Sequence, residues 1–311
     1  MVSRPHKKGN LKSIFSVLRG IFGLVILFAL VYYVSVNNVF EAIKSINVYL
    51  LPIIISLYVL FLVISTICVK ILLKQNIRFQ KLFKYYSLSW VFGLLLPGKI
   101  GEFSLAFFLK REGLRLIPSF VIFFLDKFIT FIFLTLVTFF GVFFFFDFRQ
   151  SVYFILSTSF IIFLVFSFLN IKVFWVLIPK KYRSHSEEFV KEYNLFFKEN
   201  RKKIYLNFIF TSFKWIVNSL AIFLVFLSLG VMPNILYVLV INTITAMASL
   251  IPITINGLGI RQSLGVYLFS KIGVEPTISL SMYLISLSIT YLLAFCLYSY
   301  YSYLDGSRVS Q

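Results

Sequence analysis

The sequence has few of the residues that build disulfide frameworks, metal centres and soluble surfaces. Its 311 residues include only two cysteines, two histidines and eleven acidic residues. Cys68 and Cys296 both fall inside hydrophobic runs, and no spacing typical of a metal site or a disulfide framework is present. His6 and His185 lie in polar stretches, where a solvated side chain is the ordinary interpretation. We therefore expect neither a bound metal nor a cofactor.

The signatures of common enzyme classes are also missing. The sequence contains no Walker motif and no nucleophile elbow. Residues 257–262 resemble part of a dinucleotide fingerprint, but the third glycine is not in place and no strand is expected before them. We expect no enzymatic activity. An intramembrane transferase that uses Glu102 or Asp126 as a base is the weakest of the alternatives.

Hydrophobic residues are abundant instead. They make up 60% of the chain, and the mean hydropathy is +0.94. Apolar runs near the length of about 20 residues that crosses a bilayer as a helix recur throughout. The runs do not alternate between polar and apolar residues, which argues against an outer-membrane barrel. We predict an all-α, polytopic membrane helix bundle in which residues 1–311 form a single transmembrane domain.

The net charge of +19 is explained by the distribution of Lys and Arg. A soluble protein with this charge would be a candidate for binding nucleic acid, but here the basic residues gather in loops on one side of the expected spans. Cytoplasmic loops carry such an excess. We therefore expect a cytoplasmic tail (residues 1–20), a charged cytoplasmic linker (172–203), both termini in the cytoplasm, and no nucleic-acid partner.

The expected order of segments is symmetric about the linker. A first half (21–171) contains a broken segment at 85–116, and a second half (204–311) contains another at 234–270. If each broken segment is a re-entrant hairpin, six full spans remain; if each crosses, there are eight. The six are 21–36, 50–73, 118–146, 152–169, 204–229 and 277–303.

The two broken segments are the most informative part of the sequence. Each is an apolar run interrupted by proline, glycine and charge, and each remaining piece is too short to span a bilayer. Irregular backbone survives at membrane depth only where protein buries it or water reaches it. Broken segments at corresponding places in two halves indicate a transporter binding site formed by an inverted repeat. The residues expected to break the helices are Pro97, Gly98, Gly101, Pro252, Gly257 and Gly259.

Charged residues inside the expected membrane segments mark the candidate site. Each costs about 2.5–3.5 kcal/mol at the bilayer centre by insertion scales. Four are cations and two are anions, so pairing among themselves leaves a cationic excess that suits a phosphate or another anionic head group. The six are Lys99, Glu102, Asp126, Lys127, Lys214 and Arg261. The substrate-binding residues that we predict are Lys99, Glu102, Asp126, Asn256 and Arg261.

Purely structural interpretations of the same charges remain open. Lys99 and Glu102 would then be a local pair at a hairpin tip. Asp126 would be a fixed partner of Arg261 or Lys214, and Lys127 would extend to the inner surface. In the functional interpretation, the two breaks meet near mid-depth and Asp126 lies within ion-pair or single-water distance of Arg261 or Lys99.

Several of these residues carry a resemblance to a known family. Residues 96–102 followed by 110–113, the pair at 126–127, and residues 252–261 followed by 273–274 resemble signatures of the lysylphosphatidylglycerol synthase transmembrane region family, also called flippase-like. The family often has Arg where this chain has Leu105 and Glu where it has Gln262. The resemblance implies an integral membrane protein that moves or presents lipids. The soluble aminoacyl-transferring domain of the fused synthases has no counterpart here, so lipid aminoacylation is not implied.

These observations lead to one expected function and one alternative. We expect a flippase or transporter in the cell membrane for an anionic lipid, either a phospholipid or a polyprenyl-phosphate-linked species, with membrane lipids as its partners. The alternative is a non-transporting membrane module that scaffolds or regulates a lipid- or glycan-modifying enzyme. The long charged segment at 180–203 supports that alternative.

Overall fold

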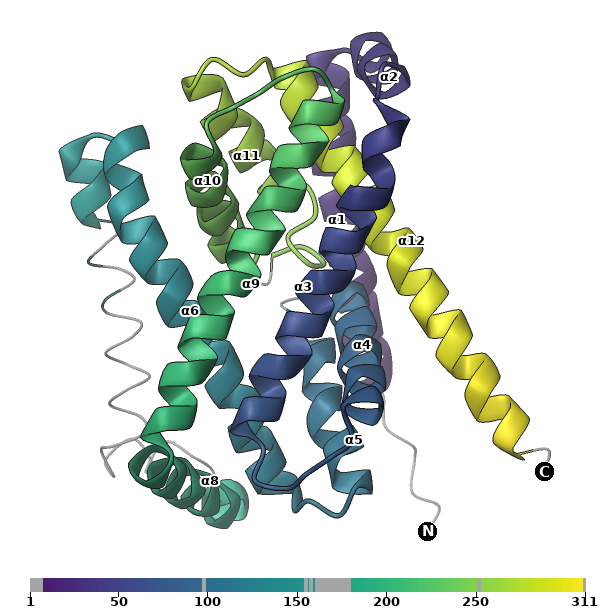
Figure 1. Cartoon of the computed structure of the whole chain (residues 1–311). Coiled ribbons are helices and arrows are strands. Elements are labelled where there is room, and N and C mark those ends of the chain that lie inside the picture. Colours follow the sequence, from purple (N-terminus) through teal and green to yellow (C-terminus); the bar gives the residue numbers. More distant parts are fainter. Residues whose placement is uncertain are drawn as a thin grey trace. The chain divides into compact units, whose positions relative to one another are not determined.

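The computed structural model describes residues 8–96, 99–153, 156, 159, 180–250 and 253–309. Within these ranges the chain is helical and contains no strand (Figure 1). The elements are α1 (Lys8–Val34), α2 (Val36–Lys44), η1 (Val48–Leu50), α3 (Leu51–Leu72), α4 (Phe79–Leu95), η2 (Ile100–Phe103), α5 (Ser104–Arg111), α6 (Leu116–Phe145), α8 (Lys180–Glu199), α9 (Arg201–Ser228), α10 (Ile235–Ala248), α11 (Ile260–Lys271) and α12 (Pro276–Val309). The predicted all-α class is confirmed.

Four of these helices are long and apolar enough to cross a membrane by length and composition. They are Val48–Leu72, Leu116–Phe145, Arg201–Ser228 and Pro276–Leu304. A fifth candidate is the pair Ile21–Val34 and Val36–Lys44, which is bent by 86° at the break. The five correspond to five of the six spans expected from the sequence. The sixth, at 152–169, lies largely outside the described residues, so the count of six stays a prediction.

The chain divides into two compact units, which are described separately. Unit 1 is Met1–Ile55, Ser87–Glu102 and Ala221–Gln311, and unit 2 is Ser56–Tyr86 and Phe103–Leu220. Each unit draws residues from both halves of the sequence, and α3, α4 and α9 contribute to both units. The proposed inverted repeat stays a prediction.

Contacts within unit 2 fix the relative directions of its long helices. Asn207 of α9 donates to Asp126 of α6 (3.4 Å), and Lys214, seven residues further on, donates to Thr130 of α6 (3.3 Å), so α6 and α9 are parallel. On α3 the order is reversed, because Cys68 contacts Thr211 while the earlier Phe61 packs against Trp215. Since α3 and α6 run in opposite directions, the chain between them leaves and returns at the same end of unit 2.

The contacts of Glu112 also place the two ends of the first broken segment at the same end of unit 2. Its carboxylate, just after α5, accepts a hydrogen bond from Tyr85 (2.6 Å) and forms an ion pair with Lys81 (2.7 Å), both on α4. The Tyr85 ring also stacks on Phe108 of α5, with ring centroids 5.3 Å apart. The beginning and the end of the first broken segment therefore lie side by side, as they do in a hairpin.

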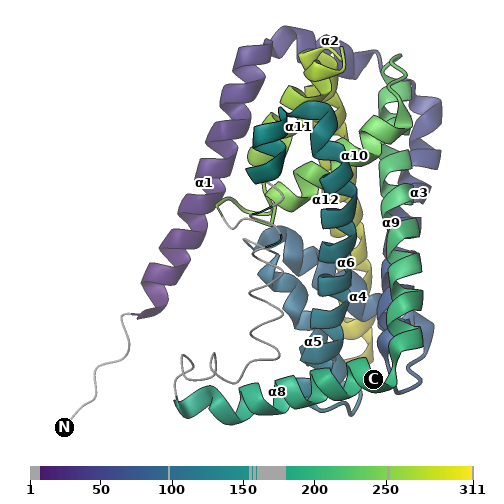
Figure 2. The same ribbon diagram turned by 90° about the vertical axis from the view of Figure 1, so that its left-hand side faces the viewer.

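Helix α8 occupies the second part of the charged linker and packs along the end of α6. Phe124 of α6 contacts the rings of Phe189 and Tyr193 at centroid distances of 5.5 and 6.1 Å. Arg115, which precedes α6, pairs with Glu188 at 3.5 Å and with Glu192. Figure 2 shows α8 running across the ends of α5 and α6. This part of the linker is therefore an amphipathic helix whose apolar face packs on α6.

In unit 1 the second broken segment forms two short helices that pack on one another. Helices α10 and α11 lie side by side in Figures 1 and 2 and are joined by irregular backbone. Phe269 of α11 packs on Phe226 of α9 with ring centroids 4.7 Å apart. On its other side α11 meets α12 so closely that a Cβ on Gly265 would lie 2.0 Å from the Tyr283 hydroxyl. Helix α11 is therefore held firmly by its neighbours.

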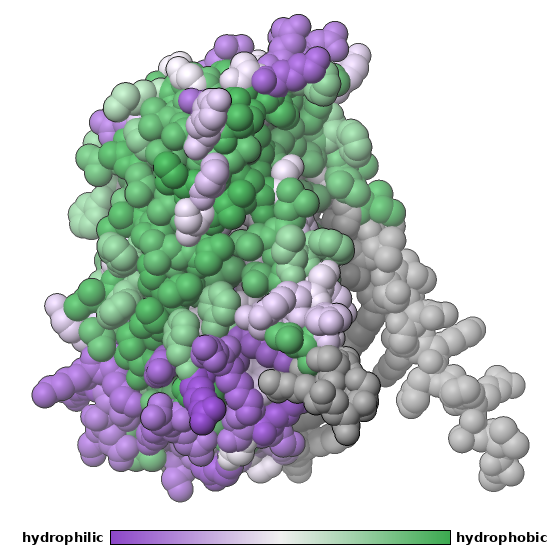
Figure 3. Space-filling view, turned by 45° about the vertical axis from the view of Figure 1, so that its right-hand side comes forward, coloured by the Kyte–Doolittle hydropathy of each residue, from purple (hydrophilic) through white to green (hydrophobic). Residues whose placement is uncertain are grey.

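The surface has the composition expected of a protein that faces lipid. Phe28 is 70% exposed on α1, Phe144 is 68% exposed on α6 and Phe295 is 68% exposed on α12. Figure 3 shows hydrophobic residues covering most of the visible face, while hydrophilic residues gather at its margins. In water such a surface would aggregate. Together with the candidate spans, it supports a multi-pass membrane protein.

Candidate functional site

The first broken segment is held against α4 by closely packed glycines. A Cβ on Gly101 would lie 2.0 Å from the backbone oxygen of Phe92, so only glycine permits this approach. A Cβ on Gly93 would lie 2.5 Å from Cγ of Glu102, whose side chain is buried. Lys99 has a left-handed backbone (φ 57°), and its carbonyl accepts the N–H of Glu102 at 3.0 Å. The break therefore turns tightly and holds Glu102 against α4.

The second broken segment is built from backbone conformations that favour glycine. Positive φ angles occur at Asn256 (49°), Gly257 (72°) and Gly259 (82°). Asparagine is one of the few other residues that adopt the left-handed region readily. A Cβ on Gly259 would lie 2.7 Å from the carbonyl oxygen of Gly23, so α1 packs directly against this break. At Gly257 and Gly259 the irregular backbone is thus buried against protein, as membrane depth requires.

Arg261 lies in the first turn of α11 and points to α10. Its Nη2 donates to Oδ1 of Asn242 at 2.8 Å, and Asn242 is 2% exposed. Its Nε is buried and has no hydrogen-bond partner. Gln262, the next residue, is buried and accepts the N–H of Gly259 at 2.7 Å, which caps the start of the helix. The hydroxyl of Thr254, also in this break, is fully buried without a partner.

The charge of Arg261 is not balanced within the described part of the chain. No described carboxylate forms an ion pair with it, and its side-chain hydrogen bond goes to a neutral amide. The first N–H groups of α11 add partial positive charge at the same place. A half-buried guanidinium in this setting attracts an anion, because no carboxylate among the described residues pairs with it.

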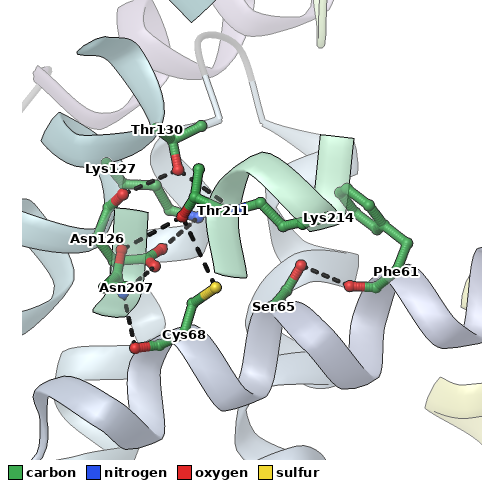
Figure 4. Close-up of polar contacts among 9 residues, drawn as sticks. All are labelled: Phe61, Ser65, Cys68, Asp126, Lys127, Thr130, Asn207, Thr211 and Lys214. Carbon is green, nitrogen blue, oxygen red and sulfur yellow. Dashed lines mark hydrogen bonds and ion pairs between the residues drawn. The ribbon is translucent and has the colours of Figure 1, made fainter. Parts of the chain in front are cut away.

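A second buried polar cluster lies in unit 2 between α3, α6 and α9 (Figure 4). Asp126 is 1% exposed, and its Oδ1 accepts a hydrogen bond from Asn207 (3.4 Å). Its Oδ2 lies 3.5 Å from the ammonium of the adjacent Lys127 and has no hydrogen bond. Asn207 also donates to the carbonyl of Cys68 at 2.7 Å. The carboxylate is therefore paired with its own neighbour on α6.

Lys127 and Lys214 differ in their surroundings. The Lys127 ammonium lies over the rings of Tyr86 and Phe123, at 5.6 and 5.3 Å from their centroids, in addition to pairing with Asp126. Lys214 is 3% exposed and donates to the Thr130 hydroxyl at 3.3 Å, but forms no ion pair among the described residues. Asp126 is thus not the ion-pair partner of Lys214, and among the described cations of unit 2 Lys214 is buried with the least compensation.

The predicted site residues fall into both units. Lys99, Glu102, Asn256 and Arg261 belong to unit 1, whereas Asp126 belongs to unit 2, so a shared site that includes Asp126 stays a prediction. Pro97, Gly98 and Pro252 lie outside the described residues. Among those described, no group of three or more His, Cys, Asp or Glu could hold a metal ion.

Sequence reasoning missed several polar residues that the structure places at these clusters. Asn207 and Thr211 were among them. With Lys214, which its charge had already singled out, they are spaced at i, i+4 and i+7 and share one face of α9. That polar stripe within a span was a usable signal. For Asn242 no comparable pattern marks the position, since a single amide in an apolar helix is ordinary. The glycine at 93 was likewise invisible without the packing of Gly101 and Glu102.

The long apolar helices, the apolar surface and the close glycine packing at the breaks define a polytopic α-helical membrane protein. A comparison with curated proteins finds no match to the chain. The sequence model of one family, described as "Lysylphosphatidylglycerol synthase TM region", matches residues 16–297. The chain belongs to this family, as its motifs at the two breaks indicated, and the match links it to lipid handling.

Proposed function

We propose that this protein moves an anionic lipid across the cell membrane, with the lipid head group held at Arg261. The observation that supports the proposal most is the guanidinium itself: it is partly buried, its Nε lacks a partner, and a neutral amide holds it. Phosphate oxygens are the natural acceptors for such a group. Lys99 would add a second cation, and Glu102 would tune the site or carry a coupling proton.

The proposal includes an orientation and excludes covalent chemistry. Both termini lie in the cytoplasm, where the positive-inside rule places the basic tail and the linker that contains α8. The protein binds, reorients and releases its lipid without forming or breaking a bond. The lipid is a phospholipid or a polyprenyl-phosphate-linked species, both of which offer phosphate oxygens.

The test is lipid movement in proteoliposomes that contain the purified protein. A fluorescent phosphatidylglycerol analogue reports the anionic substrate, and a matched phosphatidylcholine analogue reports the zwitterionic one. Arg261→Gln should slow movement of phosphatidylglycerol by about tenfold or more, as expected when a charge-assisted hydrogen bond is lost. The matched control is Lys271→Gln, which removes the same charge from the exposed end of the same helix. Equal rates in Arg261→Gln and the wild type would refute the assignment.

The scaffolding alternative predicts a different result from the same preparation. The isolated protein would then move no lipid, and a lipid- or glycan-modifying enzyme would co-purify with it in a fixed ratio. Movement by the isolated protein rules against that alternative.

A further inference from the structure

We infer that Asn242 is a positioning residue that fixes the guanidinium of Arg261 while leaving its positive charge available to an anionic phosphate group. The inference rests on the proposed function and concerns the same site. It explains why the acceptor opposite this arginine is an amide and not a carboxylate.

The geometry assigns Asn242 to the opposite arm of the second broken segment. It lies on α10, before the break, whereas Arg261 lies on α11, directly after the break. The 2.8 Å hydrogen bond from Nη2 to Oδ1 therefore joins the two arms. Because Asn242 is 2% exposed, its side chain is held by its surroundings and can hold the guanidinium in turn.

The chemistry of the acceptor decides what else the arginine can bind. A carboxylate at position 242 would accept the same hydrogen bond and would also cancel the charge of Arg261 in a medium of low polarity. An amide oxygen accepts the bond and contributes no net charge. The guanidinium is therefore oriented but not neutralised, which is the combination that an anion site requires.

The donors that remain point to an oxygen-rich ligand. Nε of Arg261 is buried and without a partner, and an unmet buried donor is costly unless a ligand meets it. The hydroxyl of Thr254, fully buried in the same break, is a second unmet group. Guanidinium groups bind phosphate oxygens with more than one N–H at a time. We therefore assign a phosphate-bearing anionic head group to this site.

The decisive variant is Asn242→Asp, which keeps the shape of the side chain and adds one negative charge. The probe is phosphatidylglycerol, titrated into the full-length protein in a neutral detergent and followed by native mass spectrometry. We expect its affinity to fall by about tenfold or more, because the new carboxylate neutralises Arg261 and repels the phosphate. The melting temperature without anionic lipid should stay at or above that of the wild type, since an ion pair replaces a neutral hydrogen bond.

Asn234→Asp is the matched control. Asn234 caps the start of the same helix, where its side-chain oxygen accepts the N–H of Leu236 at 2.9 Å. Aspartate caps helices equally well. This variant therefore places the same charge on α10 at an exposed position, and it should bind phosphatidylglycerol as the wild type does.

The outcomes separate the inference from the proposed function. Unchanged affinity in Asn242→Asp together with reduced affinity in Arg261→Gln would overturn the inference and leave the proposed function intact. Unchanged affinity in both variants would overturn both. If Asn242→Asp does not fold, Asn242→Ala decides: it removes the anchor without adding charge, and an affinity equal to that of the wild type would refute a positioning role.

Discussion

At the scale of single residues, the buried charges of this protein are compensated in different ways. Asp126 has a cation beside it on the same helix, whereas Lys214 has a hydroxyl and Arg261 an amide. Burial of a charge is costly unless an opposite charge or enough hydrogen bonds replace the lost water. The compensation of Asp126 fits a structural element, and the incomplete compensation of Arg261 fits a binding site.

Asp126 should therefore matter more for stability than Lys214 does. Asp126→Ala leaves Lys127 without its carboxylate and Asn207 without an acceptor; because the pair is only partly buried, the loss should lie below the roughly 3–5 kcal/mol of a fully buried pair. Lys214→Met removes a charge that has no carboxylate partner among the described residues. The variant should therefore lose little stability, or should be more stable than the wild type. Thermal unfolding in detergent measures both.

The double variant Asp126→Ala/Lys214→Met is the control for this prediction. It should recover part of the stability lost in Asp126→Ala, because one uncompensated cation is removed together with the anion. A double variant that is less stable than either single variant would contradict the interpretation of Lys214 as an undercompensated charge.

The sequence identified some of these residues and not others for a physical reason. A charge in an apolar run is conspicuous because of its cost, so Asp126, Lys214 and Arg261 could be singled out. Their partners Asn207 and Asn242 are neutral amides, which occur in membrane helices without special function. Which amide faces which charge depends on helix packing, and single-sequence patterns contain no such information.

At the scale of elements, the first break depends on the close approach of its backbone to α4. Gly101→Ala should destabilise the protein by about 1–3 kcal/mol, as overpacking does, because its Cβ would meet backbone atoms of Phe92 at 2.0 and 2.2 Å. Gly93→Ala should cost less, since its Cβ would first meet Cγ of Glu102, which can rotate away. Melting temperatures of the two variants test this order. Equal values would show that the contact with the Phe92 backbone does not determine the loss of stability.

The pairing of Glu112 makes the same hairpin sensitive to acid. Burial acts to raise the pKa of Glu112, but the hydrogen bonds from Lys81 and Tyr85 and the charge of Lys81 outweigh it and lower the pKa below its ordinary value of 4.5. A lowered folded-state pKa contributes stability that is present above the unfolded pKa and is lost as the pH falls through the folded value. The loss should thus occur below about pH 4.5.

Glu112→Gln removes this contribution. Its melting temperature should be lower than that of the wild type at pH 7, and it should fall less steeply on acidification below pH 4.5, the ordinary glutamate value. A variant whose acid dependence matches that of the wild type would show that other carboxylates dominate.

The breaks themselves were predictable, but the bend between α1 and α2 was not. Proline, glycine and charge interrupt the two broken segments, and these are known helix-breaking signals. The 86° bend falls at Ser35, which has a φ of 82° and no proline or glycine beside it. Packing of α2 on α12 accompanies the bend, with the Ser281 hydroxyl 3.5 Å from the Val39 carbonyl. Such a tertiary cause leaves no mark in a local sequence pattern.

At the scale of the whole molecule, hydrophobic run lengths predicted the spanning helices well because the bilayer sets their length. They could not predict the division of the chain, in which each compact unit combines residues from both halves of the sequence. Long-range pairing of helices depends on side chains that meet in three dimensions. The antiparallel arrangement of α3 and α6 is one such feature, and it bears directly on the number of spans.

The count of six spans makes a definite prediction about which loops face the outside of the cell. With a first hairpin that returns to its own side, Phe148 and Met232 lie outside and His185 lies inside; with eight crossings all three are reversed. Phe148 and Met232 are 76% and 79% exposed, and His185 lies on the exposed face of α8.

Single cysteines at these positions, in a chain whose two native cysteines are replaced, should react accordingly with a membrane-impermeant maleimide. We expect labelling of Phe148→Cys and Met232→Cys on intact cells and of His185→Cys only after permeabilisation. The antiparallel α3 and α6 favour this outcome, and the reverse pattern would mean that the first broken segment crosses the membrane.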